Sequence, residues 1–164
     1  MFIKVFVIFI ALAFGSSKGF CAFKNRTYQA ALVAKYKNCK LKKENIFLTK
    51  EQKKNISEKL GVKISSLLLR YQNPCNKSSV YVDSHIVRTL NETVIVEVKN
   101  QKISHLEIAS FMEPKDYLPP QKWLDLFKSK KKVDSLTGAT LSENAIKKLV
   151  GKYIVIDNII NDKI

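Results

Sequence analysis

Residues 134–140 are the segment of the chain best suited to bind a phosphoryl group. They read DSLTGAT and stand directly before a run of helix-forming residues. Thr137 and Thr140 supply hydroxyls, and the small residues Gly138 and Ala139 leave room for close approach. A helix N-terminus adds unpaired amides with partial positive charge, and a lysine-rich stretch precedes the segment. The segment therefore predicts a site where a phosphate is held, or is esterified to Thr140.

The same residues also have a purely structural interpretation. Thr140 is a favourable N-cap, and Thr140-Leu141-Ser142-Glu143 fits a capping box, in which the cap and the third helical residue satisfy each other's amides. Gly138 permits a tight loop before a helix. From the residues alone, a helix start and a phosphate site both stay open.

The segment resembles the D-x-x-(S/T)-G-A-T flavinylation motif of FMN-binding domains. Asp134 matches the acidic position, Thr137–Ala139 match the small core, and Thr140 matches the last threonine. Such domains occur in flavin subunits of the sodium-pumping quinone reductase and the related ferredoxin-oxidising complex, and in many small secreted electron carriers. In that family a flavin transferase takes FMN from FAD and joins its phosphate to the last threonine. The resemblance therefore implies covalent FMN on Thr140, with the rest of the motif as cofactor-binding residues.

The resemblance extends over roughly residues 47–150. The stretch YVDSHIVRT at 81–89 resembles a strand of small single-domain members, and the stretch at 111–127 resembles the segment that precedes the motif there. Arg88 is a candidate partner for the flavin phosphate or pyrimidine edge, because guanidinium donors suit planar anionic acceptors. His85 is a candidate proton donor to reduced flavin. A surface arginine at a strand end and a hydrogen-bonded structural histidine are the alternatives.

The function that the resemblance implies is extracytoplasmic electron transfer through FMN. The implied partners are an FAD-dependent flavin transferase and a membrane or periplasmic redox protein. Electron transfer of this kind is not catalysis on a small substrate, so whether the chain is an enzyme stays open. Two other functions fit the chain: a secreted basic binding protein without cofactor, and a flavin reductase-like enzyme with non-covalent FMN.

Residues 1–22 have the three regions of a secretory signal peptide. Lys4 precedes an apolar run at 5–14, which is shorter than the about 20 residues that a membrane span needs. The small residues Ser17 and Gly19 follow. We expect cleavage after about residue 19 and a periplasmic or otherwise extracytoplasmic protein. An uncleaved anchor is the alternative.

The chain contains three cysteines, of which Cys21 lies at the signal boundary. Cys39 and Cys75 can pair in an oxidising compartment, and two free thiols are the alternative. No CxxC or HExxH spacing is present, and His85 and His105 are the only histidines. The sequence therefore predicts no metal site.

The elements expected around the motif predict an α+β domain over residues 23–164, with helices packed on an antiparallel sheet, as in an FMN-binding domain. A capping box at Thr49 and Gly61 as the residue beyond the end predict a helix over 49–60. Three strands with short turns should follow as antiparallel neighbours. The expected strands are 80–87, 93–98 and 103–111, with turns at Asn91-Glu92 and at Asn100-Gln101-Lys102.

Two further helices and one strand are expected after the meander. Pro119-Pro120 introduces a short helix whose spacing puts Trp123 in the core. The last helix is predicted over 141–150 and a final strand over 153–156. Residues 23–46 carry few signals beyond a short apolar stretch at 30–34.

The net charge is +15, from 29 Lys and Arg against 14 Asp and Glu. Such a charge raises the question of nucleic-acid binding. However, the excess is mostly lysine spread along the chain, without zinc-finger spacing, an RRM aromatic signature or an arginine-rich arm. We therefore expect a solvated basic surface and no nucleic-acid partner, with an anionic membrane surface as a second partner that the charge favours.

Overall fold

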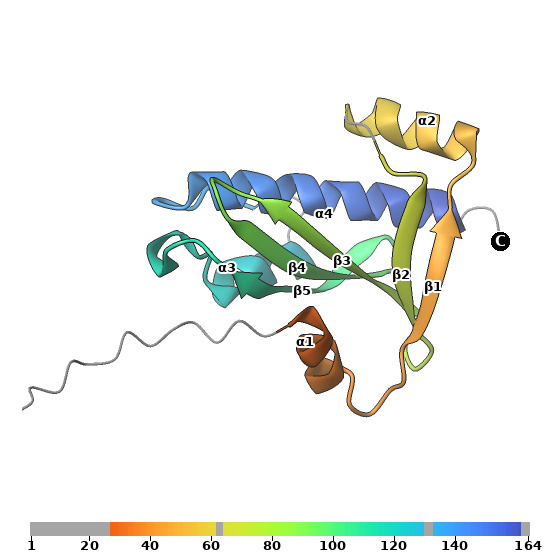
Figure 1. Ribbon diagram of the computed structural model, residues 1–164, viewed down its shortest axis with the longest axis horizontal. Coiled ribbons are helices and arrows are strands. Elements are labelled where there is room, and N and C mark those ends of the chain that lie inside the picture. Colours follow the sequence, from red (N-terminus) through yellow and green to blue (C-terminus); the bar gives the residue numbers. More distant parts are fainter. Residues whose placement is uncertain (1–26, 62–63, 130–132, 162–164) are drawn as a thin grey trace, which may run out of the picture.

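The protein is a five-stranded antiparallel sheet with helices on both faces, in a computed structural model that describes residues 27–61, 64–129 and 133–161 (Figure 1). The predicted α+β class is confirmed. The strands follow one another across the sheet in chain order, which is the meander expected from the short connections. They are β1 (Lys42–Phe47), β2 (Leu67–Asn73), β3 (Ser78–Ile86), β4 (Asn91–Lys99) and β5 (Lys102–Phe111).

The turns at the two ends of β4 differ in how well the sequence predicted them. Asn100 and Gln101 both adopt positive φ, at 49° and 62°, and join β4 to β5 as a two-residue hairpin. The turn expected at Asn91-Glu92 is wrong, because both residues already pair with β3. The β3–β4 connection is instead residues 87–90, closed by a hydrogen bond from the Val87 amide to the Leu90 carbonyl.

One face of the sheet is covered by the long helix α4 (Thr140–Asn161), together with α2 (Lys50–Leu60) and α3 (Gln121–Asp125) (Figure 1). The strand predicted over 153–156 is wrong, because α4 continues through it. Tyr153, Ile156 and Ile160 extend the buried stripe of the helix at spacings of three and four residues. Burial of this stripe against the sheet overrides the strand preference of the β-branched residues.

The capping box of α2 and its end at Gly61 are confirmed. Thr49 Oγ1 accepts a hydrogen bond from the Gln52 amide, the Gln52 side-chain Oε1 accepts one from the Thr49 amide, and Gly61 has φ 65°. The short helix after the two prolines is also present as α3, followed by the 3-10 turn η2 (Leu126–Lys128). Another 3-10 turn, η1 (Lys115–Tyr117), precedes α3.

The opposite face of the sheet is covered by α1 (Tyr28–Lys35), whose Ala31 and Leu32 pack on a second apolar cluster. All of α1 and all but the last residue of β1 lie in residues 23–46, which carry few sequence signals. A disulfide between Cys39 and Cys75 ties the α1–β1 connection to the β2–β3 turn. The pairing left open by the sequence is thus present in the structure.

Candidate functional site

Thr140 is the first residue of α4 and does not cap it. The carbonyl of Ala139 accepts the hydrogen bond from the Glu143 amide at 2.9 Å, so Ala139 occupies the N-cap position. The capping box expected at Thr140-Leu141-Ser142-Glu143 is therefore wrong. The Thr140 side chain is exposed and makes no hydrogen bond with the residues that the structure describes. Its hydroxyl is accessible from solvent.

The loop before α4 is fixed by its own internal contacts. The Glu143 carboxylate accepts a hydrogen bond from the Leu136 amide at 2.7 Å and pairs with Lys147 at 2.6 Å. The hydrogen bonds from Lys147 and from the Leu136 amide lower the pKa of Glu143. Gly138 has φ 85°, a conformation that favours glycine, and an added Cβ there would meet no atom within 4 Å. The positive φ, and not a lack of space for a side chain, is therefore the reason that position 138 favours glycine.

Trp123 holds the start of the same loop. Its ring is buried, packs edge-on against Phe127 with centroids 5.1 Å apart, and donates from Nε1 to the Asp134 carbonyl at 3.0 Å. The core position expected for Trp123 is confirmed. The Asp134 side chain itself is exposed, as is that of Thr137.

Arg88 is brought to the start of α4 by the β3–β4 connection. Its guanidinium lies 4.6 Å from the centre of the Tyr117 ring, a cation–π contact. Glu113 fixes this connection, because its Oε1 accepts from the Thr89 and Leu90 amides at 2.7 and 2.8 Å. These backbone hydrogen bonds lower the pKa of Glu113.

A cavity of about 260 Å³ lies at this point, lined by Arg88, Tyr117 and residues 138–142. The Ser142 hydroxyl closes one side by donating to the Tyr117 carbonyl at 3.0 Å. The structure thus brings together Arg88, Gly138, Ala139 and Thr140, four of the six predicted site residues, whereas Asp134 and Thr137 are not among the lining residues. The volume is below the roughly 300–1,000 Å³ of sites that enclose drug-sized ligands, and it leaves room for a phosphoryl group.

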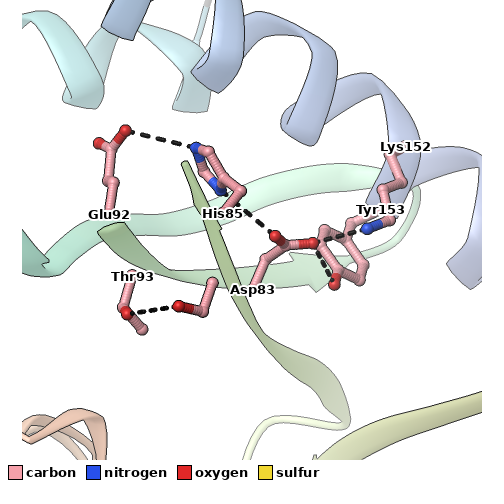
Figure 2. Close-up of polar contacts among 7 residues, drawn as sticks. Asp83, His85, Glu92, Thr93, Lys152 and Tyr153 are labelled. Atoms are coloured by element: carbon pink, nitrogen blue, oxygen red, sulfur yellow. Dashed lines mark hydrogen bonds and ion pairs between the residues drawn. The ribbon is translucent and has the colours of Figure 1, made fainter. Parts of the chain in front are cut away.

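A second polar cluster lies on the same face of the sheet, further along α4 (Figure 2). His85 Nδ1 lies 3.3 Å from Asp83 Oδ1. The other Asp83 oxygen accepts from Lys152 Nζ at 2.6 Å and from the Tyr153 hydroxyl at 2.9 Å. Tyr153 in turn stacks on Tyr81, with ring centroids 4.6 Å apart. The cluster therefore joins β3 to the C-terminal half of α4.

Glu92 extends this cluster into the interior. Its side chain is 0% exposed, and its Oε2 lies 3.3 Å from Nε2 of His85 (Figure 2). Neither Glu92 oxygen nor the His85 Nε2 makes a hydrogen bond within the described residues, so the contact is an ion pair without good hydrogen-bond geometry. A fully buried carboxylate carries a large desolvation cost, which requires a compensating charge at His85.

The charges in this cluster shift the pKa values of His85 and Asp83. Hydrogen bonding to Asp83, with the neighbouring Glu92 carboxylate, raises the pKa of His85 from 6.5 to about 9. Burial opposes ionisation of Asp83, but its hydrogen bonds from His85, Lys152 and Tyr153 prevail and hold its pKa well below the usual range. His85 is therefore protonated at neutral pH.

The raised pKa of His85 predicts a pH dependence of stability. A raised folded-state pKa contributes stability that is fully present below 6.5 and is lost as the pH rises through about 9. We expect the free energy of unfolding of the wild type to fall across this window, and to fall less in His85→Gln. Urea titrations at several pH values measure this, with His105→Gln as the matched control. Parallel curves for wild type and His85→Gln would contradict the assignment.

The sequence indicated only part of this cluster. Asp83 and His85 lie in the stretch that resembles the family. Lys152, however, falls between the helix predicted over 141–150 and the strand predicted over 153–156, and Tyr153 was assigned to that strand, which the structure does not have. The signal that could have found them is the apolar spacing of three and four residues, which continues past Gly151 through Tyr153 and Ile156.

A cavity of about 640 Å³ adjoins the cluster and has Asp83, His85, Ala145 and Leu149 in its wall. Lysines from two elements also line it: Lys59 at the end of α2, and Lys147, Lys148 and Lys152 on α4. Within the described ranges, no group of three or more His, Cys, Asp or Glu residues could hold a metal ion. No helix in the same ranges is long and apolar enough to cross a membrane.

Comparisons with known proteins found no match among protein-family models, curated proteins or solved structures.

Proposed function

We propose that the protein is an exported flavoprotein that carries FMN phosphoester-linked to Thr140 and transfers electrons outside the cytoplasm. The observation that carries the proposal is the position of the Thr140 hydroxyl. It is exposed, is not used as a helix cap, and opens onto a cavity beside Arg88 that has room for a phosphoryl group. A motif that served only to start the helix would use this hydroxyl to cap it.

The residues around Thr140 fit a bound phosphate. The first-turn amides of α4 and the positive end of its dipole favour an anion. Arg88 adds a fixed positive charge with several donors, and Glu113 keeps its loop in place. The flavin would supply the redox chemistry, while the protein binds it, orients it and tunes its electronics.

Two features support a location outside the cytoplasm. The Cys39–Cys75 disulfide is typical of proteins that fold in oxidising compartments. The second feature is the signal peptide predicted at 1–22, which lies outside the described residues. In that compartment the partners of the protein would be an FAD-dependent flavin transferase, which attaches the cofactor, and a membrane or periplasmic redox protein.

The test is the visible spectrum of the protein after co-expression with a flavin transferase, before and after denaturation. Flavin absorbance that stays with the denatured chain supports the proposal. Absorbance that is lost on denaturation indicates a flavin reductase-like protein with non-covalent FMN, and a colourless protein indicates a basic binding protein without cofactor.

Asp134→Ala should slow flavin attachment without unfolding the protein. The carboxylate is exposed, and the contact that Asp134 makes with Trp123 uses its backbone carbonyl, which alanine keeps. We therefore expect a stability change of no more than about 0.5 kcal/mol. The rate should fall, because the transferase reads the acidic position of the motif. The measurement is a time course of fluorescent product with purified transferase, FAD and magnesium.

Glu58→Ala is the matched control for this rate. Glu58 is an exposed acid on α2, and its surface ion pair with Lys54 contributes little to stability. Equal rates of flavin attachment for wild type, Glu58→Ala and Asp134→Ala would show that the transferase does not recognise the Asp134 side chain.

A further inference from the structure

The cavity that contains His85 lies about one helical turn from the cavity at Thr140. Leu141 lines the first cavity and Ala145 the second. Residues four apart occupy the same side of a helix, and a rise of about 1.5 Å per residue puts Ala145 about 7.5 Å along the axis from Thr140. The opposite walls are also close in sequence, since His85 is the last but one residue of β3 and Arg88 follows in the turn. A ligand tethered at Thr140 that outgrows the small cavity therefore has the larger one beside it.

The Glu92–His85 pair presents its positive end to this larger cavity. Glu92 is 0% exposed and does not line the cavity among the described residues, whereas the His85 side chain is 23% exposed and forms part of the wall. The negative end is thus inside the protein and the imidazolium is at the cavity. Charge in such a partly buried place is screened less than charge on a surface lysine.

We propose that the His85 imidazolium, held between Asp83 and Glu92, is the positive group that offsets the negative charge a flavin ring gains on reduction. This inference rests on the proposed attachment of FMN to Thr140. It assigns the phosphate to the small cavity and the ring to the larger one. Charge placed near the ring nitrogens is one of the ways in which a protein tunes a flavin.

The other charged groups around His85 are either matched by a charged partner or exposed to solvent, so we assign this role to the imidazole. Asp83 is matched by Lys152 at 2.6 Å, and Lys147 is matched by Glu143 at 2.6 Å. Lys59 and Lys148, which also line the cavity, are on exposed positions of α2 and α4. Asp83 and Glu92 keep the imidazole charged at neutral pH, since together they raise its pKa to about 9. The proton stays on His85 throughout.

The reduction itself balances without a reaction at His85. In the experiment dithionite is oxidised and supplies the electrons, and in the cell a reduced redox protein would do so. The solvent supplies the proton that the ring takes up. No bond to His85 forms or breaks, so its effect is electrostatic.

The first test is the midpoint potential of flavin-loaded protein, measured by dithionite titration against a reference dye. We expect the potential of His85→Gln to shift downwards from that of the wild type, because the reduced state loses its compensating charge. His105→Gln is the matched control. His105 pairs with Glu107 at 3.1 Å on β5, lines neither cavity, and should leave the potential unchanged.

The second test uses only the wild type, so it holds even if His85→Gln does not fold. If reduction and the charge on His85 favour each other, the coupling is reciprocal. The ring protons of His85, followed by NMR against pH, should then titrate at higher pH in the reduced protein than in the oxidised protein.

Two results would overturn the inference. One is a folded, fully loaded His85→Gln with the wild-type potential, and the other is an identical His85 titration in both redox states. Fluorescence of the denatured chain is checked before either measurement. A wild type without covalent flavin therefore marks the failure of the proposed function itself, and this inference falls with it.

Discussion

Thr140→Val is expected to abolish covalent flavin attachment and to leave a folded protein. Valine has nearly the shape of threonine but no hydroxyl, so the phosphoester cannot form. The stability cost should be no more than about 0.5 kcal/mol, because Thr140 is exposed and Ala139, not Thr140, occupies the N-cap position. A capping threonine would cost about 0.5–2 kcal/mol. In-gel flavin fluorescence after denaturation measures attachment, and circular dichroism with a urea titration measures folding.

Thr137→Val is the matched control, because Thr137 is exposed in the same loop and its side chain does not line the cavity among the described residues. It should keep most of the flavin. Full fluorescence in Thr140→Val would show that the hydroxyl of Thr140 is not the attachment point. Equal loss in both variants would show that the loop conformation, and not the hydroxyl, is what the substitutions disturb.

Replacing both Cys39 and Cys75 by serine is expected to lower the free energy of unfolding by about 2–4 kcal/mol. The two residues are 36 apart in the chain, so the disulfide closes a long loop in the unfolded state. It also fixes α1 and β1 to the β2–β3 turn. Urea unfolding of the double variant beside the oxidised wild type gives the difference.

The count of reactive thiols provides the control for the disulfide. The chain has three cysteines, so denatured protein that retains Cys21 should show one reactive thiol before reduction and three after. Three reactive thiols before reduction would contradict the disulfide. An unchanged free energy of unfolding in the double variant would show that the bond does not stabilise the fold.

The parts of the fold that were predictable from the sequence depend on local chemistry. The capping box at Thr49 and the stop at Gly61 act within a few residues, and the structure has both. Asn100 and Gln101 form the expected hairpin turn between strands with clear alternation. Such signals need no knowledge of distant segments.

The parts that were not predictable depend on distant contacts. Residues 153–156 read as a strand, but in α4 the Tyr153 hydroxyl reaches Asp83 and Asp157 accepts from Tyr81, across 70 and 76 residues. Thr140 reads as an N-cap, yet the Glu143 side chain that would complete the capping box bonds to Leu136 instead. The buried pairing of Glu92 with His85 likewise arises only where β3 and β4 lie side by side.

The candidate site, too, has a part that was predictable from local sequence and a part that depends on distant contacts. The motif at 134–140 was recognisable as a segment, and its adjacency to Arg88 follows from the sheet and the Glu113 contacts, which the sequence did not reveal. The proposed role of His85 in tuning a flavin depends on a cavity between β3 and α4, and no motif marks that cavity.

The most direct test of the central claim is the mass of the peptide that contains Thr140, from protein exported by cells that also produce a flavin transferase. The account predicts that this peptide carries FMN joined with loss of one water, and that fragmentation places the adduct on Thr140. An unmodified Thr140 peptide, or an adduct placed on another residue, would contradict it.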